Sequence, residues 1–184
     1  MARSGMTIWK VLAEADREQW AYVPSTSVGP LRFGMSLAEA TAVLNHFTAR
    51  VTSVPTYKAV RAEFHRPARP FWFRSAVTAY FAESEGLFCA AVDAQSGPQV
   101  VLDGIELVGR APSHVEAQLI EHAKAHDVEL RYQPEGDTEI EDLGLMMRAQ
   151  RAGDVVLTRP VFAVLGQRAY TIWDAIPGDE LDVH

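Results

Sequence analysis

Apolar residues recur at helical spacing in three parts of the chain. The first part predicts an N-terminal helix over residues 7–20, the second a helix from Ser36 to about Phe47, and the third a helix over residues 113–126. The apolar residues that define the three faces are Ile8, Val11, Leu12 and Ala15; Leu37, Ala40, Val43, Leu44 and Phe47; and Val115, Leu119, Ile120 and Ala123.

Between these helices, short apolar runs bounded by Gly, Pro, Asp and Ser predict β-strands. Residues 83–86 and 95–98 have the composition of hairpin turns. The strands are expected at residues 31–33, 50–57, 60–64, 71–81, 87–92, 128–132, 143–150, 155–157 and 161–165.

Two of the predicted helices begin with a pattern typical of a capping box. Ser36 is followed three residues later by Glu39, so each side chain can bond a free backbone N–H at the helix start. Gly34 permits the tight turn before it. Ser113 and Glu116 have the same spacing and predict a second box.

The order of elements also repeats. The glycine spacing at residues 29–34 recurs at residues 104–109, 75 residues later, and a helix and strands follow each time. We therefore predict an α+β fold of two similar units, each with a helix packed on an antiparallel sheet. These units cover residues 25–100 and 101–170, after an N-terminal helix in residues 1–24 and before an acidic tail at residues 171–184, which is expected to be loosely held after Pro177.

The segment Phe33-Gly-Met-Ser-Leu-Ala-Glu39 resembles a motif of the beta-lactamase inhibitory proteins and of small outer-membrane assembly lipoproteins. The resemblance implies a tandem repeat of a helix on a β-meander, with the concave sheet face gripping another protein. The second unit departs from the motif, because Arg110-Ala111 stands where Met35-Ser36 would be matched. The inhibitory proteins carry disulfides and the lipoproteins a lipidated cysteine, and we expect neither feature in this chain, which has a single cysteine.

Composition narrows the functional classes. Of 184 residues, 48% are hydrophobic and 22% charged, which is typical of a globular protein with a real core, and the length fits one domain or two small ones that share a core. The net charge of −7 argues against nucleic acid as a partner. We find no signal peptide and no apolar run near the ~20 residues that span a bilayer, so we expect a cytoplasmic protein without a membrane partner.

Motifs for catalysis or metal binding are weak. No phosphate-binding loop and no nucleophile elbow is present. The single cysteine, Cys89, lies in an apolar run and is interpreted as a buried hydrophobe. His114, His122 and His126 recur at helical spacing, but without a third ligand and beside Lys124 they are interpreted as a solvated polar face. We therefore expect no metal and no cofactor.

Two charged segments are candidates for binding. Residues 57–74 interleave arginines with aromatics, which describes either a phosphate-binding surface or strands with arginines outward and aromatics inward, and we favour the second. Residues 135–142 are acidic, as either a solvated loop or a surface that steers a basic partner.

We predict a non-enzymatic protein-binding module of inhibitor or immunity type. The alternatives are a regulatory protein that binds a small molecule or nucleotide and, third, an unrecognised hydrolase. Because Trp and Arg are enriched in binding hot spots, Phe71, Trp72, Arg74 and Glu139 are the candidate contacts. The partner is expected to be another protein, one with basic character if the acidic loop contacts it.

Overall fold

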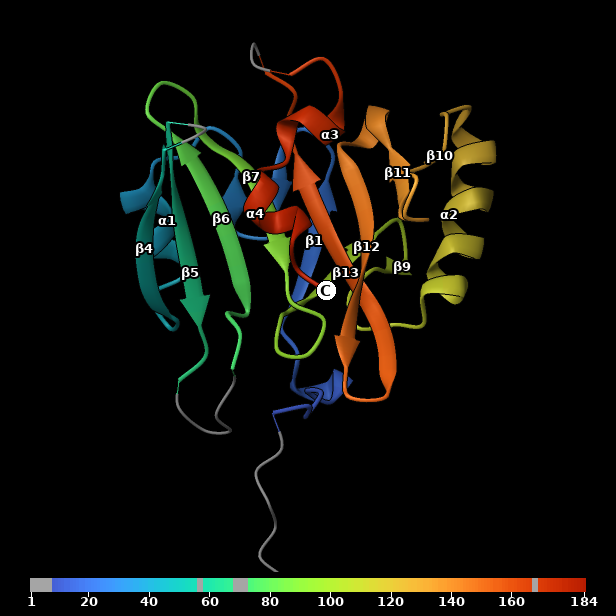
Figure 1. Ribbon diagram of the computed structural model, residues 1–184, viewed down its shortest axis with the longest axis horizontal. Coiled ribbons are helices and arrows are strands. Elements are labelled where there is room, and N and C mark those ends of the chain that lie inside the picture. Colours follow the sequence, from blue (N-terminus) through green and yellow to red (C-terminus); the bar gives the residue numbers. More distant parts are fainter. Residues whose placement is uncertain (1–7, 56–57, 68–72, 167–168) are drawn as a thin grey trace, which may run out of the picture.

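The computed structural model describes residues 8–55, 58–67, 73–166 and 169–184. Strands dominate it, and only one helix is longer than two turns (Figure 1). The strands are β1 (Gln19–Val23), β2 (Ser27–Val28), β3 (Leu31–Arg32), β4 (Thr48–Val54), β5 (Ala59–His65), β6 (Val77–Ala82), β7 (Gly86–Val92), β8 (Gln99–Leu102), β9 (Ile105–Glu106), β10 (Arg131–Tyr132), β11 (Thr138–Ile140), β12 (Leu145–Ala152) and β13 (Val155–Ala163). The α-helices are α1 (Leu37–Val43), α2 (Pro112–His126), α3 (Ile172–Ala175) and α4 (Gly178–Leu181), and 3-10 turns occupy Glu14–Asp16 and Glu141–Leu143.

One continuous sheet of eight strands forms the body of the molecule. Its order is β10-β11-β12-β13-β7-β6-β5-β4, and every neighbouring pair is antiparallel. The turn between β6 and β7 falls at residues 83–85, which confirms the predicted hairpin. The long pairing of β12 with β13 joins two predicted strands, 155–157 and 161–165, into one.

A smaller sheet of five strands packs behind the large one. Its order is β3-β2-β1-β8-β9, and its central pair, β1 with β8, is parallel. Strands distant in sequence therefore lie side by side, as Trp20 beside Val100 shows. A parallel pair needs a long crossover, which here is the whole chain between residues 24 and 98.

The face of the large sheet toward the small one, called the inner face below, carries the main apolar core. Phe64, Phe81 and Phe162 point into it, and α1 and α2 close its two ends (Figure 1). Ala40 and Leu44 of the α1 region are buried there, together with Val115, Leu119 and Ala123 of α2.

The opposite face, called the outer face, is covered in its middle by the C-terminal helices. Figure 1 shows α3 and α4 crossing in front of the sheet, while β1 lies behind it. Ile172, Ala175 and Ile176 pack there against Cys89 and Val161. The expectation of a loosely held chain after Pro177 is wrong, because Glu180 is buried there and Leu181 packs against the same cluster.

The predicted N-terminal helix is also wrong. Residues 8–13 are not helical, and the Leu12 N–H donates to the Gln95 carbonyl at 2.7 Å. The Gln95 side chain donates to the carbonyls of Ile8 and Lys10, so a polar side chain replaces helical bonds. Further along, alternate burial in β1, with Trp20 and Tyr22 inward, is the period of a strand.

The predicted fold class of two similar units, each with its own helix on its own sheet, is wrong as well. A single eight-stranded sheet runs through both units, and the second sheet pairs β1 with β8 across them. The boundary drawn between residues 100 and 101 falls inside β8. Sequence periodicity reports which residues are buried, but not which strands pair, so it could not reveal this joining of the two halves.

Of the two capping boxes predicted from sequence, one is confirmed and one is wrong. The capping box at α1 is confirmed, since Ser36 Oγ accepts from the Glu39 N–H at 3.2 Å and the Glu39 carboxylate accepts from the Ser36 N–H at 2.7 Å. The second box is wrong: α2 has Ala111 as its N-cap and Pro112 in its first turn, which starts the helix without a side-chain cap. In the described part of the chain, no helix is long and apolar enough to cross a membrane.

Candidate functional site: an arginine-lined cleft on the outer face

Polar side chains gather on the outer face of β4, β5 and β6. The register of β4 with β5 places Arg50 opposite Glu63 and Thr52 opposite Arg61. Because side chains alternate between faces along a strand, Arg61 shares the outer face with His65, while Phe64 points inward and is fully buried. The predicted arrangement of arginines outward and aromatics inward is confirmed for Arg61 and Phe64, whereas Phe73 is exposed, and Tyr57, Phe71 and Trp72 lie outside the described residues.

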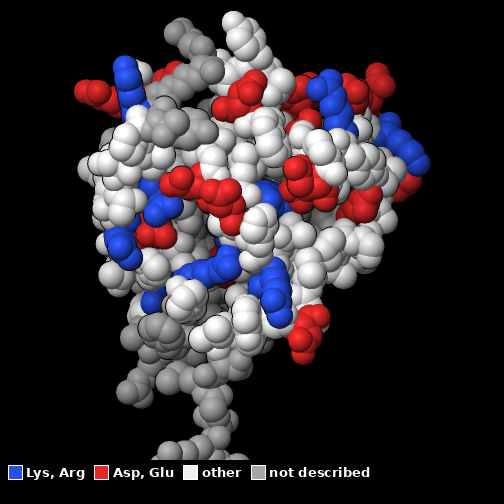
Figure 2. All heavy atoms as spheres, viewed as in Figure 1, with Lys and Arg blue, Asp and Glu red and all other residues white. Residues whose placement is uncertain are grey.

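These strands and the C-terminal segment enclose a cleft of about 310 Å³. Figure 2 shows Lys and Arg side chains gathered around a hollow on the left of this face, with acidic side chains beside them. The cleft volume lies at the lower end of the ~300–1,000 Å³ range of ligand sites. Its lining residues are Arg50, Arg61, Glu63, His65, Phe73, Arg74, Ser75, Thr78, Tyr80, Arg159, Asp179, Glu180 and Val183.

The floor of the cleft is a buried ionic network. Arg159 donates from Nε to Glu180 at 2.7 Å and approaches Asp93 at 3.4 Å, and all three are almost fully buried. Glu180 also accepts a hydrogen bond from the Tyr80 hydroxyl at 3.1 Å. Gln150 donates to Asp93 at 2.8 Å and so fixes the far end of the network.

The network sets the protonation of its members. Burial alone would lower the pKa of Arg159, but the carboxylates of Glu180 and Asp93 outweigh burial and raise it. Burial, with Glu180 adding to it, raises the pKa of the Tyr80 hydroxyl. Both groups therefore keep their protons at neutral pH, and the floor is a fixed arrangement of donors and acceptors.

The rim of the cleft is more open and its arginines are less completely paired. Arg61 binds Asp179 at 3.2 Å, and Arg74 donates to the His184 carbonyl at 3.1 Å, so two rim arginines contact the C-terminal segment. Arg50 is exposed and has no ion-pair partner among the described residues. In that part of the chain, the buried Arg61 Nε lacks a hydrogen-bond partner as well. The rim thus offers donors to an anionic group.

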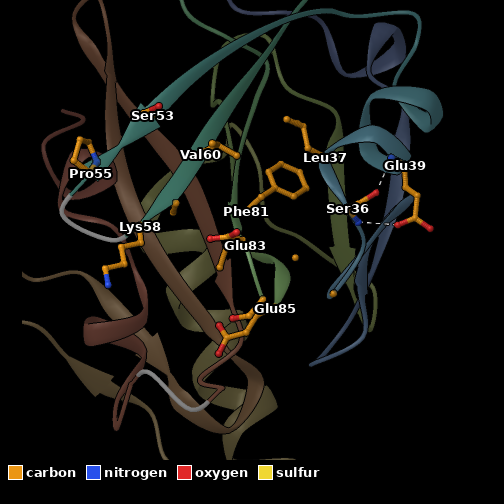
Figure 3. Close-up of a pocket in the computed structure, with 15 residues that line it drawn as sticks. Ser36, Leu37, Glu39, Ser53, Pro55, Lys58, Val60, Phe81, Glu83 and Glu85 are labelled. Carbon is orange, nitrogen blue, oxygen red and sulfur yellow. Dashed lines mark hydrogen bonds between the residues drawn. The ribbon is translucent and has the colours of Figure 1, made fainter.

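A second hollow lies on the inner side, between α1 and the end of β4 to β6. It encloses about 940 Å³, and Figure 3 shows Leu37, Val60 and Phe81 around its apolar part. Glu83, Glu85 and Lys58 also line it, and Glu39 lies on the opposite side (Figure 3). This groove combines an apolar wall with charged groups around it, which suits an amphipathic small molecule.

The structure divides the four contact residues predicted from sequence. Arg74 lines the cleft, beside the exposed ring of Phe73. Phe71 and Trp72 lie outside the described residues. Glu139 is buried, at 5% exposure, and accepts a hydrogen bond from Gln133, so it does not present a charge on the surface.

Sequence reasoning missed most of the cleft. Arg50, Arg159 and Glu180 are distant in sequence and meet only because the outer face collects alternate residues of several strands and one helix. A signal for part of it was present, since Arg61, Glu63 and His65 alternate with buried residues along β5.

Comparison of the chain with protein-family models, with curated proteins and with solved structures finds no match.

Proposed function

We propose that this protein binds another protein by taking an acidic segment of that partner into the cleft on the outer face. The observation that carries the proposal is the occupation of the rim by the chain's own acidic C-terminal segment, through Arg61 with Asp179 and Arg74 with His184. Two rim arginines therefore already bind oxygen atoms of one peptide segment. Arg50 beside them has no ion-pair partner among the described residues and can bind a further carboxylate.

The chemistry of the rim suits this role. The guanidinium group presents a planar fork of donors that matches a carboxylate, and arginine is enriched at protein interfaces. Phe73 is 70% exposed at the same edge and can pack against an apolar neighbour of the acidic residues. The buried network of Arg159 and Glu180 fixes the side chains of the floor. Fewer side chains then have to be ordered on binding, so the entropic cost of binding is smaller.

An inhibitor or immunity role follows from such binding, because a protein that occupies a partner's acidic surface blocks it. The expected basic partner depended on the acidic segment 135–142, of which Glu139 is buried while Glu135 and Asp142 are exposed, and no arginine-lined cleft was expected. We therefore propose an acidic partner instead.

The experiment measures binding of a fluorescein-labelled oligoglutamate peptide by fluorescence anisotropy. We expect saturable binding that weakens with added salt, because exposed charges are screened. The variants Arg50→Glu and Arg74→Glu should weaken it at least about tenfold, since each places a like charge at the rim. Arg131→Glu on β10, at the opposite edge of the same sheet, is the matched control and should bind as the wild type does.

The same variants then test the natural partner. Tagged wild type is used to capture proteins from a lysate, and the stoichiometric partner is compared with that captured by Arg50→Glu. Loss of that partner with Arg50→Glu but not with Arg131→Glu supports the cleft. A partner that both variants retain contradicts it.

A second candidate function is binding of a small amphipathic molecule, which the 940 Å³ groove beneath α1 favours. Ser53 is exposed and lines this groove, so Ser53→Phe should place a bulky ring in it and obstruct part of it. Compounds that raise the Tm of the wild type should then fail on that variant but still stabilise Val51→Phe, whose site is on the same strand outside the groove. Equal stabilisation of both variants would exclude the groove.

A further inference from the structure

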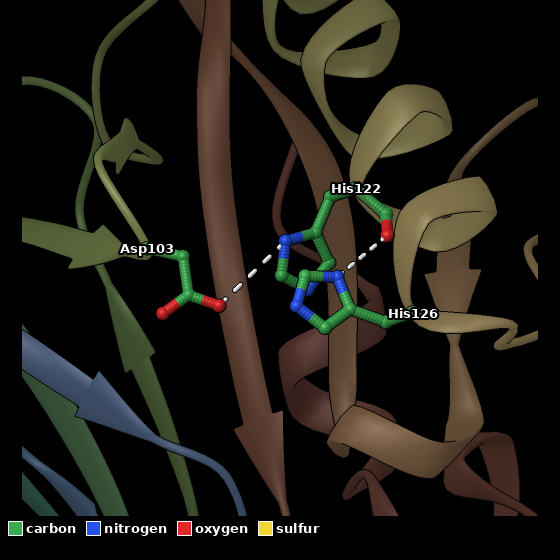
Figure 4. A group of neighbouring side chains, drawn as sticks. All are labelled: Asp103, His122 and His126. Atoms are coloured by element: carbon green, nitrogen blue, oxygen red, sulfur yellow. Dashed lines mark hydrogen bonds and ion pairs between the residues drawn. The ribbon is translucent and has the colours of Figure 1, made fainter.

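A hairpin turn brings a carboxylate to the C-terminal part of α2, away from the cleft. Residues 103 and 104 connect β8 with β9 as Asp-Gly, a sequence typical of a two-residue turn with both residues at positive φ. Asp103 has φ of +45° and Gly104 of +82°. The turn aims the Asp103 carboxylate at His122 of α2, 3.7 Å from its Nδ1 (Figure 4).

His122 and His126 lie one helical turn apart on the same side of α2. Their rings stack with centroids 4.1 Å apart. His126 Nδ1 is 2.9 Å from the His122 carbonyl oxygen, an acceptor, so His126 carries its proton on Nδ1 when neutral. The lone pair of His126 is therefore on Nε2, which points toward Asp103 in Figure 4.

The three side chains converge on one point. One donor atom from each of Asp103, His122 and His126 lies within 4.8 Å of the other two. In the described ranges of the chain, no second group of three His, Cys, Asp or Glu side chains converges in this way.

We propose that Asp103, His122 and His126 bind a divalent transition-metal ion of the Zn²⁺ class. Two imidazole nitrogens and one carboxylate oxygen are a ligand set that such ions accept, whereas Ca²⁺ and Mg²⁺ prefer oxygen alone. The bond from His126 to a backbone carbonyl is the outer contact that orients metal-binding histidines. Three protein ligands leave at least one position for water or for an atom of a partner.

The surroundings leave the group accessible to an ion. His122 is buried at 8% exposure, whereas Asp103 and His126 are exposed, so an ion can reach the three side chains from solvent. Lys124, whose charge counted against a site in the sequence, forms its ion pair with Glu121 at 2.9 Å.

The test is isothermal titration of the full chain with ZnCl₂, together with the absorption spectrum of added Co²⁺ as a report of nitrogen and oxygen ligands. The wild type should bind one Zn²⁺ per chain. Asp103→Asn and His126→Gln should each weaken binding at least about tenfold, as loss of a ligand does. Asn tolerates the positive φ at residue 103, and residue 126 is exposed, so both variants should keep the fold.

The matched control is His114→Gln, which removes an exposed histidine from the same helix outside the group. It should bind Zn²⁺ as the wild type does and give the same Co²⁺ spectrum. Absence of saturable Zn²⁺ binding to the wild type overturns the proposal. Equal affinity in the wild type, Asp103→Asn and His126→Gln overturns it too, because the metal would then be bound elsewhere.

Discussion

The two faces of the eight-stranded sheet differ in how they are held. The inner face packs apolar side chains, Phe64, Phe81 and Phe162 among them, against a second sheet and two helices. The outer face is covered by two helices of four residues each, which combine an apolar cluster around Ile172 and Ile176 with the buried ionic network of Arg159 and Glu180. The inner face therefore depends mainly on apolar area, whereas the outer face adds specific charge partners to it.

The difference assigns stability mainly to the inner face and ligand recognition to the outer face. Burial of apolar area is the dominant favourable contribution to folding and does not depend on orientation. A buried ion pair adds little net stability because desolvation offsets the attraction, but each partner is costly to lose alone. The outer face is thus suited to hold fixed donors for a ligand, while the inner face keeps the sheet in place behind them.

The largest effect is expected on the inner face. Phe162 of β13 is fully buried, and its ring centroid lies 4.4 Å from that of Tyr22 in the small sheet. Phe162→Ala should lower the free energy of unfolding by ~3–5 kcal/mol, because it removes apolar contacts and leaves a cavity. Urea unfolding followed by circular dichroism measures the change.

Val156→Ala on the same strand is the control. Its side chain is half exposed, so the free energy of unfolding should change by less than ~0.5 kcal/mol. A loss below about 1 kcal/mol in Phe162→Ala would mean that the two sheets do not share a rigid core.

On the outer face, Glu180→Gln should be nearly as costly. Of the ion-pair partners of the buried Arg159 in the described ranges, it leaves Asp93, and we expect a loss of about 3 kcal/mol in the free energy of unfolding. Replacing all three charges, in Arg159→Met with Glu180→Leu and Asp93→Asn, should recover most of that loss because no charge of the network is then left buried without its partner. Phe162→Ala has no such rescue, and this contrast distinguishes the faces.

Asp179→Asn, on the same helix, is the control for Glu180→Gln. Its carboxylate pairs with Arg61 but is half exposed, so its loss should cost less than ~1 kcal/mol. Cys89 beneath the helices is a built-in probe, because it is fully buried and burial raises the pKa of its thiol. Thiol labelling should be faster in Glu180→Gln than in the wild type, and equal labelling rates would contradict a role of Glu180 in holding α4.

The elements that sequence predicted well are those fixed by local contacts. The capping box at Ser36 and the hairpin before β7 were predicted correctly, since each depends on residues close in sequence. The N-terminal helix failed because Gln95, far along the chain, binds the backbone at residues 8–12 and holds it extended. Pairing of β1 with β8 failed for the same reason, as no local pattern specifies a parallel partner.

The candidate sites show the same limit. Arg74 was named from its aromatic and basic neighbours, but the arginines that share its cleft come from β4, β5 and β13. His122 and His126 were recognised as a pair at helical spacing, yet the third group, Asp103, comes from the turn between β8 and β9 of the small sheet. Residues that lie on a single element could therefore be predicted from sequence, but the pairing of elements that completes each site could not.

The smallest effect is expected at α1, which closes one end of the inner face. Ser36→Ala should lower the free energy of unfolding by about 1 kcal/mol, because the Glu39 N–H loses its acceptor. Hydrogen bonds from Ser36 lower the pKa of Glu39 from its usual 4.5, so the stabilisation that Glu39 contributes is present above pH 4.5 and is lost as the pH falls through the lower folded value. The difference in stability between the wild type and Glu39→Gln should therefore shrink in acid.

Ser113→Ala is the matched control for the cap. Ser113 precedes Glu116 with the same spacing as in the box at Ser36, but it lies inside α2, after the N-cap Ala111. Its hydroxyl caps nothing there, and alanine is the better helix former, so the free energy of unfolding should stay equal or rise slightly. Equal losses in Ser36→Ala and Ser113→Ala would contradict this prediction. They would mean that the Ser-x-x-Glu sequence, and not the position of the serine at the N-cap, determines the stability of the helix start.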